Sequence, residues 1–138
     1  MRRQDKYPDT ATFHYYNANP HNRITSDCTV RAVCTALEQD YKQTAREMLE
    51  MGLACGLIVG DPNLTDRYLS SKGWRKCPQP RKSDNTKYTG AEFCRLRKAG
   101  GNIVAHVGGH HIVAIVNKRI WDVWDSTDGC VGNYWVKE

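Results

Sequence analysis

The spacing of apolar residues divides the chain into two parts. Before residue 100, apolar residues recur every three or four positions, which is the period of an amphipathic α-helix. This spacing predicts four helices, at residues 28–39, 41–52, 62–72 and from residue 89 through Arg97. Asp27 and Asp40 precede two of these helices and are each expected to cap the helix that follows. Arg31, one turn into the first helix, is expected to form a structural ion pair.

After residue 100, short runs of β-branched residues alternate with turn-forming pairs. These runs predict strands at residues 103–107, 111–116, 119–125 and 131–136, with two shorter strands near residues 12–16 and 74–77. The pair Asn117-Lys118 suits a tight hairpin, so we expect the late strands to form an antiparallel sheet. Helices first and an antiparallel sheet last predict an α+β fold.

The 138 residues contain no internal repeat and no linker, which predicts one domain over residues 1–138. Residues 1–22 lack clear periodicity, so we expect an extended N-terminal arm there. No apolar run approaches the roughly 20 residues of a membrane span. The basic start, Met1-Arg2-Arg3, is not followed by the apolar segment of a signal peptide. We therefore expect a cytoplasmic protein without a membrane partner.

Charge and cysteine spacing argue against two further classes of protein. The net charge is +5, but no nucleic-acid-binding module is visible, so a nucleic-acid partner is not expected. The six cysteines include no C-x-x-C pair, and without a secretory signal they predict neither disulfides nor a zinc site. A metal site built from His106, His110 and His111 would match no familiar ligand spacing. We therefore expect no cofactor.

Cys28 has the local setting of an activated thiol. It stands where a polar turn becomes a helix, and a helix N-terminus stabilises a thiolate through its dipole and free N–H groups. An imidazole that takes the proton, and a third group that orients the imidazole, would complete a nucleophilic site. The Cys28 backbone N–H and a side-chain amide from the preceding turn would stabilise an oxyanion. Asn22 can supply that amide, or it can serve the turn alone.

Three segments contain the residues of such a site in order. They are Asn22 with Asp27-Cys28-Thr29-Val30-Arg31-Ala32, then Gly109-His110-His111-Ile112-Val113-Ala114, then Trp121-Asp122-Val123-Trp124-Asp125-Ser126. In these segments the chain resembles the papain-like cysteine peptidase superfamily, and more closely a group of small phage and prophage proteins of that fold. The resemblance implies N-terminal helices packed on a C-terminal antiparallel sheet. It also implies Cys28 as nucleophile, His111 as general base, Asp122 as its orienting residue and Asn22 as oxyanion donor.

Neighbouring residues compete for two of these roles. His110 is the rival of His111, but strand alternation sends adjacent side chains to opposite faces, so only one can meet Cys28. The same alternation places Asp122 opposite Asp125, and Asp125 has the character of a turn residue. We therefore favour His111 and Asp122. Papain itself has Asn at the orienting position and Gln at the oxyanion position, so the chain departs from it at both.

The expected activity is that of a cysteine hydrolase, a peptidase or isopeptidase acting on a peptide or protein through an acyl-thioester intermediate. Two alternatives share the fold. One is a catalytically inactive papain-fold protein that a phage uses as a binding or structural module. The other is a transglutaminase-like acyl transferase with the same order of triad residues. A phage-encoded protein of this kind would act in the cytoplasm of the host cell.

Overall fold

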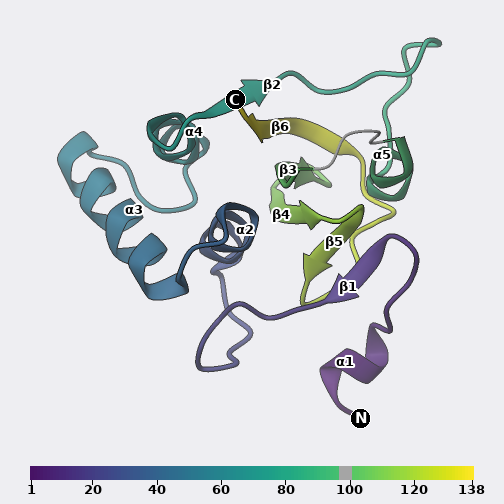
Figure 1. The fold of residues 1–138 in the computed structure, drawn as a ribbon, viewed down its shortest axis with the longest axis horizontal. Coiled ribbons are helices and arrows are strands. Elements are labelled where there is room, and N and C mark those ends of the chain that lie inside the picture. Colours follow the sequence, from purple (N-terminus) through teal and green to yellow (C-terminus); the bar gives the residue numbers. More distant parts are fainter. Residues whose placement is uncertain (97–100) are drawn as a thin grey trace.

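The fold is a mixed six-stranded sheet with helices on both faces (Figure 1). The computed structural model describes residues 1–96 and 101–138. Its strands are β1 (Phe13–Tyr15), β2 (Trp74–Cys77), β3 (Ile103–Val107), β4 (His111–Val116), β5 (Arg119–Asp122) and β6 (Val131–Lys137). Its helices are α1 (Arg3–Lys6), α2 (Cys28–Leu37), α3 (Tyr41–Cys55), α4 (Pro62–Ser71) and α5 (Gly90–Leu96). The predicted α+β class is confirmed, and none of the described helices is long and apolar enough to cross a membrane.

The strands follow the order β1-β5-β4-β3-β6-β2 across the sheet. β3, β4 and β5 form an antiparallel meander. Asn117 and Lys118, between β4 and β5, have φ angles of 52° and 64°, the left-handed conformation of a two-residue hairpin turn. β6 runs antiparallel to both β3 and β2. The short connections therefore place the start of β4 beside the end of β5.

β1 runs parallel to β5, which corrects the expectation of a purely antiparallel sheet. β1 lies in the N-terminal arm, after the short helix α1, and Phe13 pairs with Ile120. Most of the chain lies between these two strands, and a long connection of this kind is what parallel strands require. No local hairpin joins β1 to its partner, so the sequence around β1 does not reveal the pairing.

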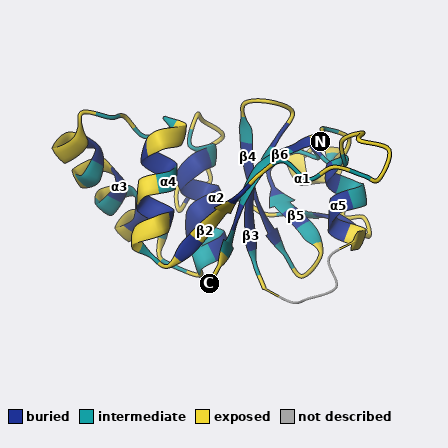
Figure 2. Cartoon of the chain, turned by 90° about the horizontal axis from the view of Figure 1, so that it is seen from above, coloured by how far each residue is buried: buried dark blue, intermediate teal, exposed yellow. Residues whose placement is uncertain are grey.

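Two apolar layers cover opposite faces of the sheet. α2 packs against β4 with α3 and α4 beyond it, and this layer contains Val33, Met48 and Trp135. α5 contributes to the other layer, which contains Phe13 and Ile115. Figure 2 shows α2, α3 and α4 on one side of the strands and α5 on the other. The helix that begins at the candidate nucleophile is therefore the one held directly against the sheet.

Most helix limits agree with the sequence, but α3 is longer than expected. Its start is confirmed, since the Asp40 side chain accepts a hydrogen bond from the Gln43 amide at 3.0 Å. It continues past Gly52, where a Cβ atom would lie 2.3 Å from the Leu57 carbonyl oxygen. Gly52 is therefore required by close packing rather than by the end of a helix. Arg97, which was expected in the last helix, lies outside the described residues.

Candidate active site

Cys28 is the first residue of α2, and its side chain is half-buried. Asp27 occupies the N-cap position, but its side chain makes no hydrogen bond to the amides of the first turn. The predicted cap is therefore wrong, because Arg31 engages the carboxylate instead, with 2.8 Å between Arg31 Nε and Asp27 Oδ1. This contact confirms the ion pair expected for Arg31. The first-turn amides beside Cys28 stay available to a thiolate or an oxyanion.

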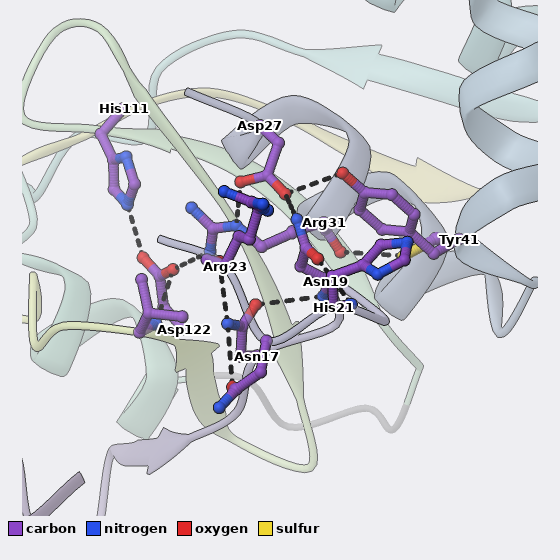
Figure 3. Close-up of polar contacts among 12 residues, drawn as sticks. Asn17, Asn19, His21, Arg23, Asp27, Arg31, Tyr41, His111 and Asp122 are labelled. Atoms are coloured by element: carbon purple, nitrogen blue, oxygen red, sulfur yellow. Dashed lines mark hydrogen bonds and ion pairs between the residues drawn. The ribbon is translucent and has the colours of Figure 1, made fainter. Parts of the chain in front are cut away.

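His111 and Asp122 meet at one end of the β4–β5 pair. β4 begins at His111 and the antiparallel β5 ends at Asp122. The His111 Nε2 atom lies 2.5 Å from Asp122 Oδ2 (Figure 3). β5 is shorter than predicted, so Asp125 lies beyond it and accepts a hydrogen bond from the Thr127 amide. The structure thus brings His111 to Asp122 and not to Asp125.

The His111 ring is also hydrogen-bonded to the Cys28 thiol. Since Asp122 occupies Nε2, the ring nitrogen left for the thiol is Nδ1. The backbone N–H of Ile112 donates a second hydrogen bond to the Cys28 sulfur. Three of the residues named from the sequence therefore form one hydrogen-bonded chain, which runs from Cys28 through His111 to Asp122.

Cys28 and His111 shift each other's pKa in opposite directions. The hydrogen bond from His111 holds the pKa of Cys28 below its ordinary value, against the opposing effect of burial. Burial would lower the pKa of His111, but the hydrogen bonds with Asp122 and Cys28 outweigh it and raise the pKa to about 9. The buried thiols of Cys34 and Cys94 differ, because desolvation raises the pKa of each to about 11. The two shifts have the directions that favour a thiolate–imidazolium pair between Cys28 and His111.

Asp122 is fixed by donors on both carboxylate oxygens. Its side chain is only 2% exposed, and Oδ1 accepts hydrogen bonds from Arg31 Nη1 at 2.5 Å and from the Val123 amide at 2.8 Å. Oδ2 faces His111. The Trp124 ring lies against the His111 ring with 4.9 Å between centroids. The carboxylate and the imidazole are therefore both held in one orientation.

Asn19 and Tyr41 also belong to this network, although no motif in the sequence points to either. The Asn19 side-chain amide and the Tyr41 hydroxyl donate to Asp27 Oδ2 at 3.0 Å and 2.8 Å (Figure 3). Burial would raise the pKa of Asp27, but the hydrogen bonds from Arg31, Asn19 and Tyr41 together hold it below its ordinary value. An Asn before a Pro and a Tyr at a helix start are common, and no local pattern ties either one to Asp27.

Asn22 contacts residues of its own segment rather than the other site residues named from the sequence. It is exposed, its φ angle is 53°, and its Oδ1 accepts a long hydrogen bond of 3.3 Å from Asn17 Nδ2. Among the described residues it makes no hydrogen bond to Cys28, His111 or Asp122. Its part in an oxyanion hole therefore stays a prediction.

The remaining candidate histidines lie outside this chain of contacts. His110 is exposed in the turn before β4. His106 lies on β3 with its ring 5.4 Å from that of Trp135, and burial lowers its pKa. Within residues 1–96 and 101–138, no group of three or more His, Cys, Asp or Glu side chains is placed to hold a metal ion.

Two cavities lie beside α2, and neither is lined by Cys28 or His111. One, of about 510 Å³, opens at the C-terminal end of α2 near Trp74. The other, of about 400 Å³, is lined in part by the aromatic side chains of Tyr16 and Trp121. The His111 side chain, 17% exposed, lies outside both.

No protein-family model matches the chain, and no curated protein or solved structure matches it either. A half-buried thiol at a helix start contacts an imidazole, and the imidazole is backed by a buried carboxylate. A thiol, an imidazole and a carboxylate in this order are the groups that a thiol nucleophile, its base and an orienting residue would require.

Proposed function

We propose that the protein is a papain-like cysteine hydrolase that cleaves an amide or isopeptide bond in a peptide or protein. The observation that carries the proposal is the hydrogen-bonded chain from Cys28 through His111 to Asp122, with Cys28 at the start of α2. A carboxylate behind the imidazole and an uncapped helix terminus beside the thiol both favour a reactive thiolate. The site of action would be the cytoplasm, that of the host for a phage-encoded protein.

In the first step, the Cys28 thiolate attacks the substrate carbonyl carbon. A C–S bond forms while the carbonyl π electrons move to oxygen. The His111 imidazolium gives its Nδ1 proton to the leaving nitrogen as the C–N bond breaks. An acyl-thioester on Cys28 and a neutral His111 remain. Throughout, Asp122 keeps the Nε2–H of His111 bonded, so that Nδ1 stays directed at the reacting atoms.

In the second step, water replaces the departed amine. His111 Nδ1 takes a proton from the water as its oxygen attacks the thioester carbonyl. The C–S bond then breaks, which releases a carboxylic acid product and restores the Cys28 thiolate beside the His111 imidazolium. The net reaction consumes one water and produces one acid and one amine.

The negative oxygen of each tetrahedral intermediate needs N–H donors. The Cys28 backbone N–H is the first, since the Asp27 side chain leaves the first turn of α2 uncapped. Asn22 Nδ2 is the proposed second donor. Its side chain is exposed and restrained by one long contact to Asn17, so it can be redirected toward a bound substrate at small cost.

The papain-like assignment is supported by the placement of the three groups. The nucleophile begins a helix that packs on a sheet, and two adjacent strands of that sheet carry the base and its orienting residue. The chain differs from papain in having Asp122 where papain has Asn and in proposing Asn22 where papain has Gln. A carboxylate at the orienting position stabilises the imidazolium more strongly than an amide does.

The first test is selective labelling of Cys28 with limiting iodoacetamide at about pH 6, read by peptide mass spectrometry. Cys55 and Cys130 are exposed thiols in the same chain and serve as internal references. We expect Cys28 to be labelled fastest although it is less exposed, because His111 stabilises its thiolate. The advantage should disappear in His111→Ala.

The second test measures cleavage of a fluorogenic peptide library by the wild type and by Cys28→Ala. Cleavage that depends on Cys28 supports the hydrolase. Labelling of Cys28 no faster than of Cys55 would contradict the proposal at its first step. Fast labelling of Cys28 without peptide cleavage would favour a binding module. If a primary amine is added to the assay and becomes joined to the acyl product, an acyl transferase is favoured.

A further inference from the structure

We propose that Arg31 is a positioning residue that ties the orienting carboxylate Asp122 to the start of the helix that carries Cys28. The inference rests on the proposed function, because it concerns how the Cys28 thiol and the His111 imidazole are held in contact. Arg31 lies one turn after Cys28 on α2 and is 9% exposed at its side chain. It contacts neither the thiol nor any expected reacting atom, so it would act through other residues.

At one end, Arg31 fixes the rotation of the Asp122 carboxylate. Arg31 Nη1 and the Val123 amide both donate to Oδ1, at 2.5 Å and 2.8 Å. With Oδ1 occupied, Oδ2 is the oxygen left for His111 Nε2. Rotating the carboxylate would break two hydrogen bonds in a buried position and would cost free energy, because the donors would be left without a partner. Arg31 thereby selects the oxygen that holds the imidazole.

At the other end, Arg31 holds the residue before the nucleophile. Its Nε donates to Asp27 Oδ1 at 2.8 Å. The second oxygen of Asp27 accepts from Asn19 and Tyr41. One planar guanidinium therefore spans two carboxylates, and Figure 3 shows Arg31 between Asp27 and Asp122. The bridge joins the end of β5 to the start of α2, the two places whose separation sets the Cys28–His111 contact.

The charges favour positioning over stability alone. The charged groups that face one another here are Asp27, Arg31, Asp122, His111 and Cys28. Burying such a cluster adds little net stability, because desolvation offsets much of the attraction. A lysine would keep the positive charge, but it lacks the planar fork that bonds two carboxylates through different nitrogens. Charge and geometry can therefore be separated by substitution.

The test compares Arg31→Lys with the wild type and with Arg119→Lys as matched control. Arg119 lies on β5 in a looser, exposed pair with Asp9, 3.7 Å apart. Two quantities are measured: the pH dependence of Cys28 alkylation by iodoacetamide, and the titration of the His111 ring by NMR. For Arg31→Lys we expect alkylation at neutral pH to slow about tenfold and the His111 pKa to fall by about one pH unit. Arg119→Lys should change neither.

Each outcome decides for or against the inference. The inference is overturned if Arg31→Lys folds with reduced stability but has the same Cys28 alkylation rate and the same His111 titration as the wild type. That is the behaviour of a residue that only stabilises the fold. If Arg31→Lys does not fold, Asp27→Asn takes its place, because it weakens the contact between Asp27 and Arg31. It should slow Cys28 alkylation and lower the His111 pKa by smaller amounts than those expected for Arg31→Lys. If Asp27→Asn changes neither quantity, the inference is also overturned. Failure of the proposed function looks different: no peptide is cleaved by any variant, while the dependence of Cys28 reactivity on Arg31 is still measurable.

Discussion

Replacing Asp122 with Asn removes one negative charge from the site with little change in shape. The Asp122 side chain is 2% exposed and lies 2.5 Å from both His111 Nε2 and Arg31 Nη1. An Asn keeps the volume but has one acceptor oxygen and one NH2 donor in place of two acceptor oxygens, so the response reports the loss of the charge together with the loss of one acceptor. We expect the pKa of His111 to fall and the Cys28 thiolate to lose part of its stabilisation.

The magnitude follows from the raised pKa of His111. Its value of about 9 exceeds the ordinary 6.5 by 9 − 6.5 = 2.5, and hydrogen bonds with Asp122 and Cys28 share this increase against the effect of burial. Assigning about half of the increase to Asp122 gives a fall of about one pH unit, or roughly 1.4 kcal/mol. The His111 ring of Asp122→Asn should therefore titrate near pH 8, at about one unit below wild type.

The stability of the protein should respond to pH with a defined sign. Because folding raises the pKa of His111, this group stabilises the native state fully below pH 6.5, and the contribution is lost as the pH rises through about 9. Asp122→Asn should lose less stability than wild type over that interval. Cys28 has a lowered pKa and contributes in the opposite direction: its stabilisation is present above the ordinary thiol pKa and is lost as the pH falls. Both proteins contain Cys28, so subtracting the wild-type stability from that of Asp122→Asn cancels most of the Cys28 contribution.

The assay is NMR titration of the His111 ring, with urea unfolding at both ends of the pH interval. Asp125→Asn is the matched control, because Asp125 accepts hydrogen bonds from Thr127 in a turn and does not bond His111. An unchanged His111 titration in Asp122→Asn would show that Asp122 does not raise the pKa of His111. An equal fall in Asp125→Asn would also contradict the role of the Asp122 contact, since the effect would then be one of net charge.

Three further predictions follow from single contacts. Cleavage of an amide substrate should decline as the pH rises through about 9, where His111 loses the proton that the leaving amine needs; a rate that stays flat beyond that pH contradicts this role. Trp124→Ala should slow Cys28 alkylation a few-fold by admitting water beside the His111 ring, whereas Trp124→Phe, which keeps a ring, should not. Gly52→Ala should cost about 1–3 kcal/mol in urea unfolding through the clash with the Leu57 carbonyl, and near-wild-type stability would contradict that packing.

Local signals predicted the fold wherever neighbours in the sequence are also neighbours in space. The cap at Asp40 and the hairpin at Asn117-Lys118 each depend on a few adjacent residues, and both are present. The parallel pairing of β1 with β5 depends on packing between distant parts of the chain, and no local pattern encodes it. Gly52 stands at the end of the helix predicted at residues 41–52, but α3 continues past it and its missing side chain admits the Leu57 carbonyl.

The candidate site also has residues that local patterns predict and residues that they do not. The contacts of Cys28, His111 and Asp122 could be predicted because a helix start and the alternation of two strands fix where each side chain lies. Asn22 lies in an irregular segment with a φ angle of 53°, where no period sets the direction of a side chain. The contact of its side chain with Asn17 could therefore not be predicted, and the same holds for the contact of Asn19 with Asp27.

Asp27 shows how a local prediction can be wrong because a side chain bonds to distant residues instead. An aspartate at the N-cap position ordinarily accepts hydrogen bonds from the first turn, and losing that cap costs about 1 kcal/mol. Here the carboxylate is bonded to Arg31, Asn19 and Tyr41 instead. The exchange leaves the amides beside Cys28 without a side-chain cap, and it anchors the Arg31 guanidinium that also bonds Asp122. A helix optimised for stability would keep the cap, whereas under the proposed function the first turn of this helix would gain by leaving its amides free for the Cys28 thiolate.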